Sequence, residues 1–288
     1  MTDALRAIIE RKRAEVEQSK ARMTFKELES LVAQADPPRN FFGAVTRHPS
    51  QAHVTIVPEI VRLDAAGRPV RPEFTADEPG KYDVPGIARR YHSAGAEAIS
   101  VVTDAAAGGA LEHLELARDA VPVPILRKDP IIDPWQLWES RAAGADAVLL
   151  IVDTLPEGDL VDLLILAQQL RLTAVLEVRS MDSLLRARPH IGFPHRAYGL
   201  LAINNREMAP PRPGEGGDPD GGDIAGTLRL LDLVDDLSVV VSEGGVRTRD
   251  DVVRLTAVGV RIVLAGSELL RQSDPAAALS ELRTPRVR

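Results

Sequence analysis

The 288-residue sequence contains no cysteine. Disulfide bonds, thiolate catalysis and cysteine-ligated metal sites are therefore excluded. Histidine is scarce, and none of the six histidines forms a pair at the helical spacing that metal ligands use. We accordingly expect neither a metal ion nor an organic cofactor in the functional site.

The sequence also has no excess of positive charge, because 35 lysine and arginine residues are outnumbered by 42 aspartate and glutamate residues, for a net charge of −7. A nucleic-acid-binding protein usually has a concentrated basic surface, so that class is disfavoured. No apolar run is long enough to span a membrane, and residues 1–22 lack the uninterrupted apolar core of a signal peptide. These patterns favour a cytoplasmic protein that binds neither nucleic acid nor membrane.

The residues that are present describe an ordinary globular protein, with 44% hydrophobic and 27% charged residues. Residues 1–34 have the pattern of a charged helix. The proline pair at 37–38 then interrupts the chain before a short helix. Chain length alone leaves open whether one large domain or two small ones follow.

From residue 54 onward, short apolar segments alternate with segments of helical period. The strand candidates are residues 54–60, 98–102, 123–126, 147–152, 174–178, 199–203, 238–241 and 262–265. Eight successive strand–helix units indicate parallel strands with crossover helices, and eight strands close a TIM barrel of about 250 residues. A doubly wound sheet is the rival, but "EIVRLDAAG" is not the glycine-rich turn that usually follows its first strand.

We therefore predict an α/β protein with a (β/α)8 TIM barrel over residues 51–288 and an N-terminal helical extension over residues 1–50. The extension has a thin apolar stripe made of Leu5, Ile8, Ile9 and Val16. We expect this stripe to cover the barrel; a partner contact is the alternative.

Ionisable or glycine-rich residues follow nearly every strand candidate, where a barrel places its active site. For any one of them, a salt bridge or a helix N-cap is an equally good explanation, but a structural barrel does not need the whole set. The set comprises Glu59, Thr103, Asp104, Lys128, Asp153, Glu177, Asn204, Asn205, Arg206, Ser242, Glu243, Gly244, Gly245, Gly266 and Ser267.

Two glycine-containing turns, "SEGGV" and "AGSELL", follow the last two strand candidates. This position is the usual place for a phosphate-binding site in a TIM barrel. Glycine lets backbone N–H groups approach an anion, and the helix that Ser267 begins would add the positive end of its dipole. We predict a phosphate site at Gly244, Gly245, Gly266 and Ser267; two ordinary tight turns are the alternative.

In this order, these residues resemble the indole-3-glycerol-phosphate synthase family of tryptophan biosynthesis. The resemblance covers most of the chain and includes "PPRNFFGAV", "YHSAGAEAISVVTD", "PILRKDPIIDPWQLWESRAAGADAVLLIV", "INNREM", "VVSEGGV" and "LAGSELL". It implies a carboxy-lyase that closes a ring in an anthranilate-derived ribulose 5-phosphate, with loss of carbon dioxide and water. That phosphorylated small molecule would be the binding partner, and we expect a monomer or a weak homo-oligomer.

The resemblance also implies roles for individual residues. Lys128 would be the general acid at the substrate carbonyl oxygen, Glu177 the proton-accepting carboxylate and Glu59 a second one. The residues that orient the substrate or support the lysine would be Asn204, Arg206 and Glu243. A lysine among carboxylates stays protonated, but burial can lower its pKa, and we expect this combination to suit Lys128 to acid catalysis.

The sequence departs from the family pattern at the substrate end of this site. The family lysine two positions after Glu59 is Val61 here, and Arg62 is a poor substitute because it lies on the opposite face of the strand. A family serine beside the substrate carboxylate corresponds to Asp64, whose charge we expect to repel that group. The other replacements are Pro130 for a phenylalanine, Gly244 for a serine, Arg179 for a histidine and "AAAGG" at 105–109 for an aromatic pair.

Two loops could supply what these replacements remove. Residues 62–86 include Arg68, Arg71 and Lys81, and residues 209–222 have the Pro/Gly content of a lid or of a disordered insertion. Three interpretations stay open: a synthase in which one of these cations compensates for Val61, a paralogue for a different phosphorylated sugar, and a non-catalytic phosphate-binding protein. Retention of Lys128 and the residues around it argues against the non-catalytic protein, since a site without activity would not need them. Between the other two interpretations, the missing aromatic residues favour the paralogue and the overall match favours the synthase, which we adopt.

Overall fold

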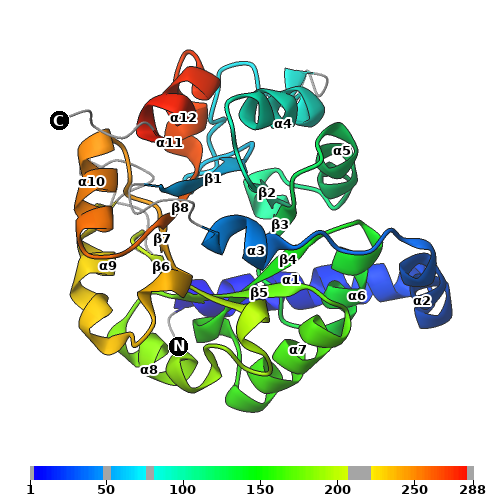
Figure 1. The fold of residues 1–288 in the computed structure, drawn as a ribbon. Coiled ribbons are helices and arrows are strands. Elements are labelled where there is room, and N and C mark those ends of the chain that lie inside the picture. Colours follow the sequence, from blue (N-terminus) through cyan, green and yellow to red (C-terminus); the bar gives the residue numbers. More distant parts are fainter. Residues whose placement is uncertain (1–2, 48–52, 76–80, 207–221, 284–288) are drawn as a thin grey trace.

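The structure is a computed structural model that describes residues 3–47, 53–75, 81–206 and 222–283. Eight parallel strands form a closed barrel in the order β1 to β8, surrounded by helices (Figure 1). The strands are β1 (Thr55–Ile60), β2 (Ile99–Val102), β3 (Ile125–Lys128), β4 (Ala147–Ile151), β5 (Thr173–Val178), β6 (Gly199–Asn204), β7 (Val240–Glu243) and β8 (Ile262–Ala265). The predicted (β/α)8 TIM barrel is confirmed.

Two strands differ from the predicted boundaries by more than one residue. β3 begins later and reaches Lys128, because prolines at 122 and 124 cannot donate the hydrogen bonds of a strand ladder. β7 begins at Val240 because residues 237–239 form a 3₁₀ turn that Asp236 caps. Arg127 and Lys128 are therefore strand residues rather than the first residues of a loop.

The helices between and after the strands form the outer layer of the barrel (Figure 1). They are α4 (Val84–Ser93), α5 (Glu112–Ala120), α6 (Pro134–Ala142), α7 (Glu157–Gln169), α8 (Met181–Ala187), α9 (Ala225–Leu230), α10 (Arg249–Ala257), α11 (Ser267–Leu270) and α12 (Pro275–Arg283). Short 3₁₀ turns are η2 (Ala105–Ala107), η3 (Val152–Thr154), η4 (Arg188–His190), η5 (Arg196–Tyr198), η6 (Leu231–Leu233) and η7 (Leu237–Val239). Among the described residues, none of the helices is both long and apolar enough to cross a membrane.

Three helices precede β1: α1 (Asp3–Arg22), α2 (Phe25–Gln34) and α3 (Phe41–Thr46). The expectation of one helix through residue 34 is wrong, because Thr24 and Glu27 form a capping box that starts a new helix. The Thr24 hydroxyl accepts a hydrogen bond from the Glu27 N–H at 3.3 Å, and the Glu27 carboxylate accepts one from the Thr24 N–H at 2.7 Å.

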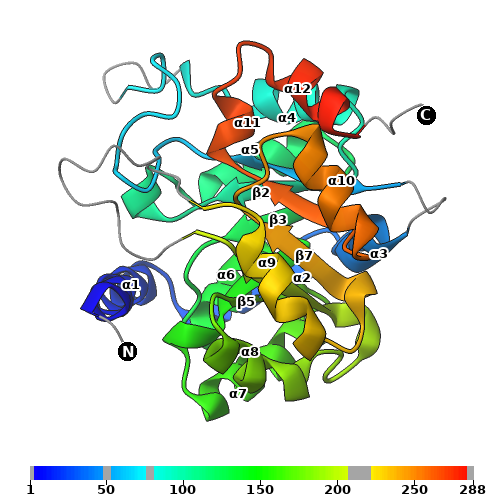
Figure 2. The same ribbon diagram turned by 90° about the vertical axis from the view of Figure 1, so that its left-hand side faces the viewer.

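The N-terminal helices close the two ends of the barrel. In Figure 2, α1 lies on one side of the barrel and α3 on the other. Phe41 and Val45 of α3 belong to the apolar cluster that fills the barrel interior. On α1, Val16 packs with Leu28 and Trp135, which places the predicted apolar stripe against the barrel.

Candidate active site

Charged side chains at the strand ends continue the inward-facing rows of the barrel. Side chains alternate along a strand, so the residue two positions after an interior residue lies on the same face. On β1, β3 and β5, an interior apolar residue is followed two positions later by a charged residue that lines the site: Val57 and Glu59, Leu126 and Lys128, and Val175 and Glu177. The charged members line a cavity of about 220 Å³ at the carboxyl ends of the strands.

Lys128 lies at the centre of this cavity between two carboxylates. Its Nζ is 2.9 Å from Glu243 Oε1 and 3.1 Å from Glu59 Oε2, and the Asn204 side-chain amide donates a hydrogen bond to the same Glu243 oxygen at 2.8 Å. Burial disfavours the ammonium form of Lys128, but Glu243 and Glu59 outweigh burial, and its pKa is raised above the ordinary lysine value. The expectation that burial would lower this pKa is therefore wrong.

Glu177 faces the same cavity and is held by an arginine from its own strand end. Both Nε and Nη2 of Arg179 contact Glu177 Oε1, at 2.8 and 2.7 Å. Burial works against ionisation of Glu177, but Arg179 and Lys128 outweigh it, and the pKa of Glu177 lies below its ordinary value. Burial instead raises the pKa of Glu243, despite the opposing effect of Lys128. The cavity thus holds carboxylates with opposite tendencies to bind a proton.

Arg206 crosses from β6 toward the turn after β8. The Arg206 N–H donates to Asn204 Oδ1 at 3.0 Å, which fixes the backbone where the side chain departs. A Cβ added to Gly266 would come within 2.6 Å of Arg206 Nη2 and 2.8 Å of Glu59 Oε1. Glycine at position 266 therefore leaves the space in which this guanidinium lies.

We expect Gly266→Ala to raise KM for a phosphorylated substrate by about tenfold or more, because displacing one charge-assisted hydrogen bond costs about 1.4 kcal/mol or more. Steady-state kinetics with the substrate proposed below measures the effect. Gly158→Ala is the matched control, since a Cβ there meets nothing within 4 Å. An unchanged KM in Gly266→Ala would show that Arg206 does not depend on this space.

The two turns predicted to bind phosphate differ in what they can offer an anion. Gly244 and Gly245 have φ angles of +73° and +74°, a conformation that side-chain-bearing residues rarely adopt. The Gly244 N–H donates to the Leu264 carbonyl at 3.3 Å, so that donor is already engaged. Ser267 is buried and lines the cavity, but the helix it begins has four residues, so the expected dipole contribution is small.

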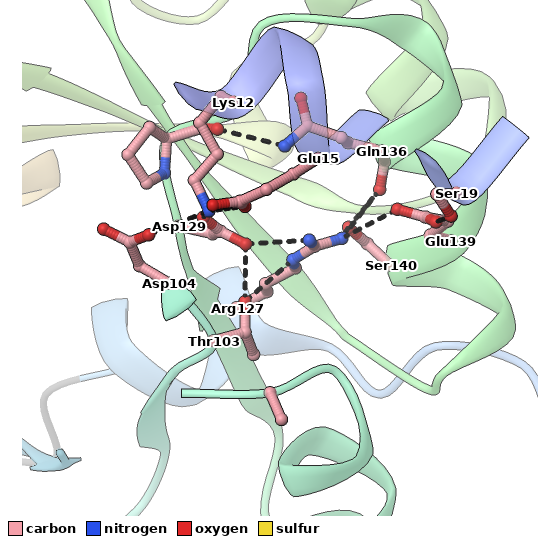
Figure 3. Close-up of polar contacts among 12 residues, drawn as sticks. Lys12, Glu15, Ser19, Thr103, Asp104, Arg127, Asp129, Gln136, Glu139 and Ser140 are labelled. Atoms are coloured by element: carbon pink, nitrogen blue, oxygen red, sulfur yellow. Dashed lines mark hydrogen bonds and ion pairs between the residues drawn. The ribbon is translucent and has the colours of Figure 1, made fainter. Parts of the chain in front are cut away.

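Thr103 and Asp104, predicted as rim residues, belong to a second polar cluster around Arg127 (Figure 3). Asp104 and Asp129 of this cluster also line the cavity. Arg127 points outward there: its Nη2 is 2.8 Å from Asp129 Oδ2, and its Nε donates to the Thr103 hydroxyl at 3.0 Å. Lys12 of α1 reaches the same cluster, with Nζ 2.6 Å from Asp129 Oδ1 and 2.9 Å from Asp104 Oδ1. Arg127 and Lys128 therefore point to opposite faces of β3, and Asp129, which follows the strand, contacts Arg127 and also lines the cavity.

The α1 helix also forms part of the cavity wall. Ile8, which lies one helical turn before Lys12, lines the cavity together with Val61, Leu63 and Pro130. Lys12 is 1% exposed, an unusual burial for a lysine. Sequence reasoning missed this role, because a lysine within a charged helix has the pattern of a solvated face.

The cations of loop 62–86 do not lie in this cavity. Arg68 pairs with Asp64 at 3.0 Å, and Arg271 contacts the same carboxylate at 3.1 Å, so the expected repulsion by Asp64 is reduced. Arg71 and Lys81 line a separate cavity of about 350 Å³. The cation that does line the site, besides those predicted, is Arg179. The expected lid at 209–222 lies outside the described residues, apart from its last residue.

Comparison with known proteins assigns the chain to one family. The family model described as Indole-3-glycerol phosphate synthase matches residues 5–282. The chain belongs to this family. Curated proteins named indole-3-glycerol phosphate synthase from Acidithiobacillus ferrooxidans and Rhodospirillum rubrum are 37% and 35% identical to it, each over 98% of this chain and 99% of their own.

Solved structures support the same architecture at lower sequence similarity. A crystal structure of 3-hexulose-6-phosphate synthase has a TM-score of 0.57 and 17% identity, and it covers 80% of this chain and 98% of its own. The same enzyme from Salmonella typhimurium has a TM-score of 0.55 and 16% identity, over 79% of this chain and 97% of its own. At such identities the likeness is evidence for the barrel fold alone.

Proposed function

We propose that this member of the indole-3-glycerol phosphate synthase family catalyses the family reaction with Lys128 as its general acid. Membership of the family makes the chain a carboxy-lyase of tryptophan biosynthesis. The observation that carries the residue assignment is the position of the Lys128 ammonium between Glu59 and Glu243, inside a cavity that Glu177 also lines.

The reaction begins with ring closure. The ring carbon that bears the carboxylate attacks the carbonyl carbon of the ribulose chain, and Lys128 gives a proton to the carbonyl oxygen as the carbon–carbon bond forms. Loss of carbon dioxide from the attacked ring carbon returns an electron pair to the ring and restores its aromaticity. The raised pKa of Lys128 means that the proton is present at neutral pH before the reaction starts.

Dehydration completes the indole. The new hydroxyl leaves as water, and the five-membered ring loses one proton, so the step neither gains nor loses charge overall. Glu177 suits the acceptor role because its lowered pKa keeps it ionised. Glu243 and Glu59 hold the ammonium in place, and Glu59 is a second carboxylate within reach of the reacting groups.

The phosphate end of the site lies at the β7 and β8 turns. We assign Gly244, Gly245, Gly266 and Ser267 to the phosphate. Backbone N–H groups would be the donors, except that of Gly244, which is bonded to the Leu264 carbonyl. Asn204 and Arg206 orient the substrate between this end and Lys128, an assignment that the contacts of Arg206 at Gly266 support.

The remaining assignments rest on sequence patterns. We propose an N-terminal helical extension over residues 1–50 and a barrel over residues 51–288. We also propose a monomeric or weakly self-associating enzyme that works in the cytoplasm on its phosphorylated substrate and does not bind nucleic acid.

The direct test is turnover of the anthranilate-derived ribulose 5-phosphate, followed by fluorescence of the indole product. We expect turnover by the wild-type chain and strongly reduced turnover by Lys128→Ala. The apolar Val61 in the cavity wall favours one second candidate, a related enzyme for a different phosphorylated sugar. Absence of wild-type turnover, together with calorimetric binding of a simple sugar phosphate, would support that candidate and reject the synthase assignment.

A further inference from the structure

We propose that Arg179 binds the carboxylate of the substrate, the group that leaves as carbon dioxide. This inference rests on the proposed function, because that substrate carries two anionic groups, a phosphate and a ring carboxylate. The phosphate is assigned to the turns after β7 and β8. The carboxylate needs a second cation elsewhere in the cavity, because leaving an anion unpaired in a largely buried site is costly.

Three cations line the cavity within the described part of the chain: Lys128, Arg179 and Arg206. Lys128 is held between two carboxylates and is required at the carbonyl oxygen. Arg206 extends toward Gly244 and Gly266, which places its guanidinium at the phosphate end. Arg179 is the cation that neither the carbonyl nor the phosphate requires.

The position of Arg179 follows from strand alternation. Val175 lies in the barrel interior and Glu177 lines the cavity, so the side chain two positions further, Arg179, continues the same inward row. On β1 the equivalent position after Glu59 is Val61, which is 5% exposed and supplies only apolar surface. The cation missing from the β1 side of the rim is thus present on the β5 side.

The contacts of Arg179 leave capacity for a second anion. Nε and Nη2 both point at a single oxygen, Glu177 Oε1, and Nη1 makes a long 3.4 Å hydrogen bond to the Arg206 carbonyl. A guanidinium has five N–H donors, so it can retain one bond to Glu177 and still bind a carboxylate. The side chain of Arg179 is 23% exposed, compared with 12% for Lys128 and 2% for Glu177, so a ligand can reach it.

The loop cations are poorer candidates for the same role. Arg68 is committed to Asp64, which it meets through Nε and Nη2 at 3.0 Å each. Arg71 donates to the carbonyls of Leu270 and Gln272 and faces a different cavity.

The test compares two unreactive ligands by calorimetry. Both carry an alcohol in place of the substrate carbonyl, so that neither can cyclise, and only one carries the ring carboxylate. For the wild-type chain we expect the carboxylated ligand to bind at least about tenfold more tightly, the effect of one charge-assisted contact. In Arg179→Gln this ratio should fall to about one.

Three further variants make the result specific. Arg68→Gln should keep the wild-type ratio, and Val61→Lys introduced into Arg179→Gln should restore part of it by returning a cation to the cavity wall. Arg179→Lys keeps the charge, so its ratio of the two ligand affinities should lie between one and the wild-type ratio. This variant provides the test if Arg179→Gln fails to fold. A wild-type ratio that persists in Arg179→Gln, or a ratio of one in the wild-type chain, would overturn the inference. Failure of the synthase assignment is distinguishable, because the wild-type chain would then bind neither ligand and show no turnover.

Discussion

Replacing Lys128 by alanine is expected to lower kcat by about 10²–10⁴-fold, the contribution that a single general acid makes. The variant loses the proton donor for the carbonyl oxygen and leaves Glu59 and Glu243 without their shared ammonium. Steady-state and single-turnover fluorescence assays measure the loss. A decrease of less than about tenfold would assign the acid to another group.

Lys128→Arg separates proton donation from charge. The guanidinium keeps a cation between the two carboxylates but does not release its proton near neutral pH, so we expect a folded and nearly inactive enzyme. Because the pKa of Lys128 is raised above its ordinary 10.5, the wild-type acid stays protonated throughout the working range. The ratio of wild-type to Lys128→Ala kcat should therefore be the same at about pH 7 and about pH 9. A ratio that falls at the higher pH would contradict this protonation state.

Replacing Lys12 by methionine is expected to lower the free energy of unfolding by about 3 kcal/mol, the lower end of the cost of breaking a buried ion pair. Methionine keeps much of the side-chain volume but leaves Asp129 and Asp104 with fewer cations. The lower end applies because Arg127 still contacts Asp129 and Arg11 still contacts Asp104. Urea unfolding, followed by circular dichroism, measures the change.

The matched control for Lys12 lies on the same helix. Lys20 pairs with Asp133 at 2.9 Å but is 36% exposed, so Lys20→Met should cost less than about 1 kcal/mol. Equal losses in the two variants would mean that burial of Lys12 adds nothing to its ion pairs.

The loss in Lys12→Met should also depend on pH. Burial opposes ionisation of both partners, but the pKa of Lys12 is raised by Asp129 and Asp104, and the pKa of Asp129 is lowered by Arg127 and Lys12. The contribution of Lys12 to the free energy of unfolding is fully present at pH values below the ordinary lysine pKa of 10.5. It is lost only as the pH rises through the raised pKa of Lys12. The contribution of Asp129 is full above its ordinary 3.8 and is lost as the pH falls through its lowered pKa. The difference between wild-type and variant should be constant near neutrality and shrink in strong acid.

The sequence is sufficient to predict the barrel, because eight apolar segments of strand length recur between segments of helical period. It is less reliable for boundaries, as β3 illustrates. There the apolar residues at 123–126 suggest a strand that stops before Arg127, whereas the prolines delay its start and the ladder continues through Lys128. Strand ladders depend on backbone hydrogen bonds as well as on hydrophobicity, so an apolar run does not mark where a ladder ends.

The residues of the site also differ in how well the sequence predicts them. Glu59, Lys128 and Glu177 were predictable, because each lies at the carboxyl end of an apolar strand. Arg179 lies two residues after Glu177, the same spacing that separates Val61 from Glu59. This spacing is visible in the sequence, but position 179 stands out there only as an arginine in place of a family histidine. No local sequence pattern predicts the buried ion pairs of Lys12, because its partners lie far along the chain and become neighbours only when the barrel closes.

The long separation between α1 and its partners has a consequence for synthesis. Arg11 and Asp104, which contact each other in the same cluster as Lys12, are 93 residues apart. At a translation rate of about 5–20 residues per second, the helix is complete roughly 5–20 s before its partners exist. During that interval Lys12 lacks Asp104 and Asp129 and can pair with Glu15 on its own helix. Because α1 is strongly charged and its apolar stripe is narrow, it exposes little apolar surface through which nascent chains could associate. The α1 helix, which forms part of the cavity wall in the folded protein, must therefore remain exposed until the barrel strands have been synthesised.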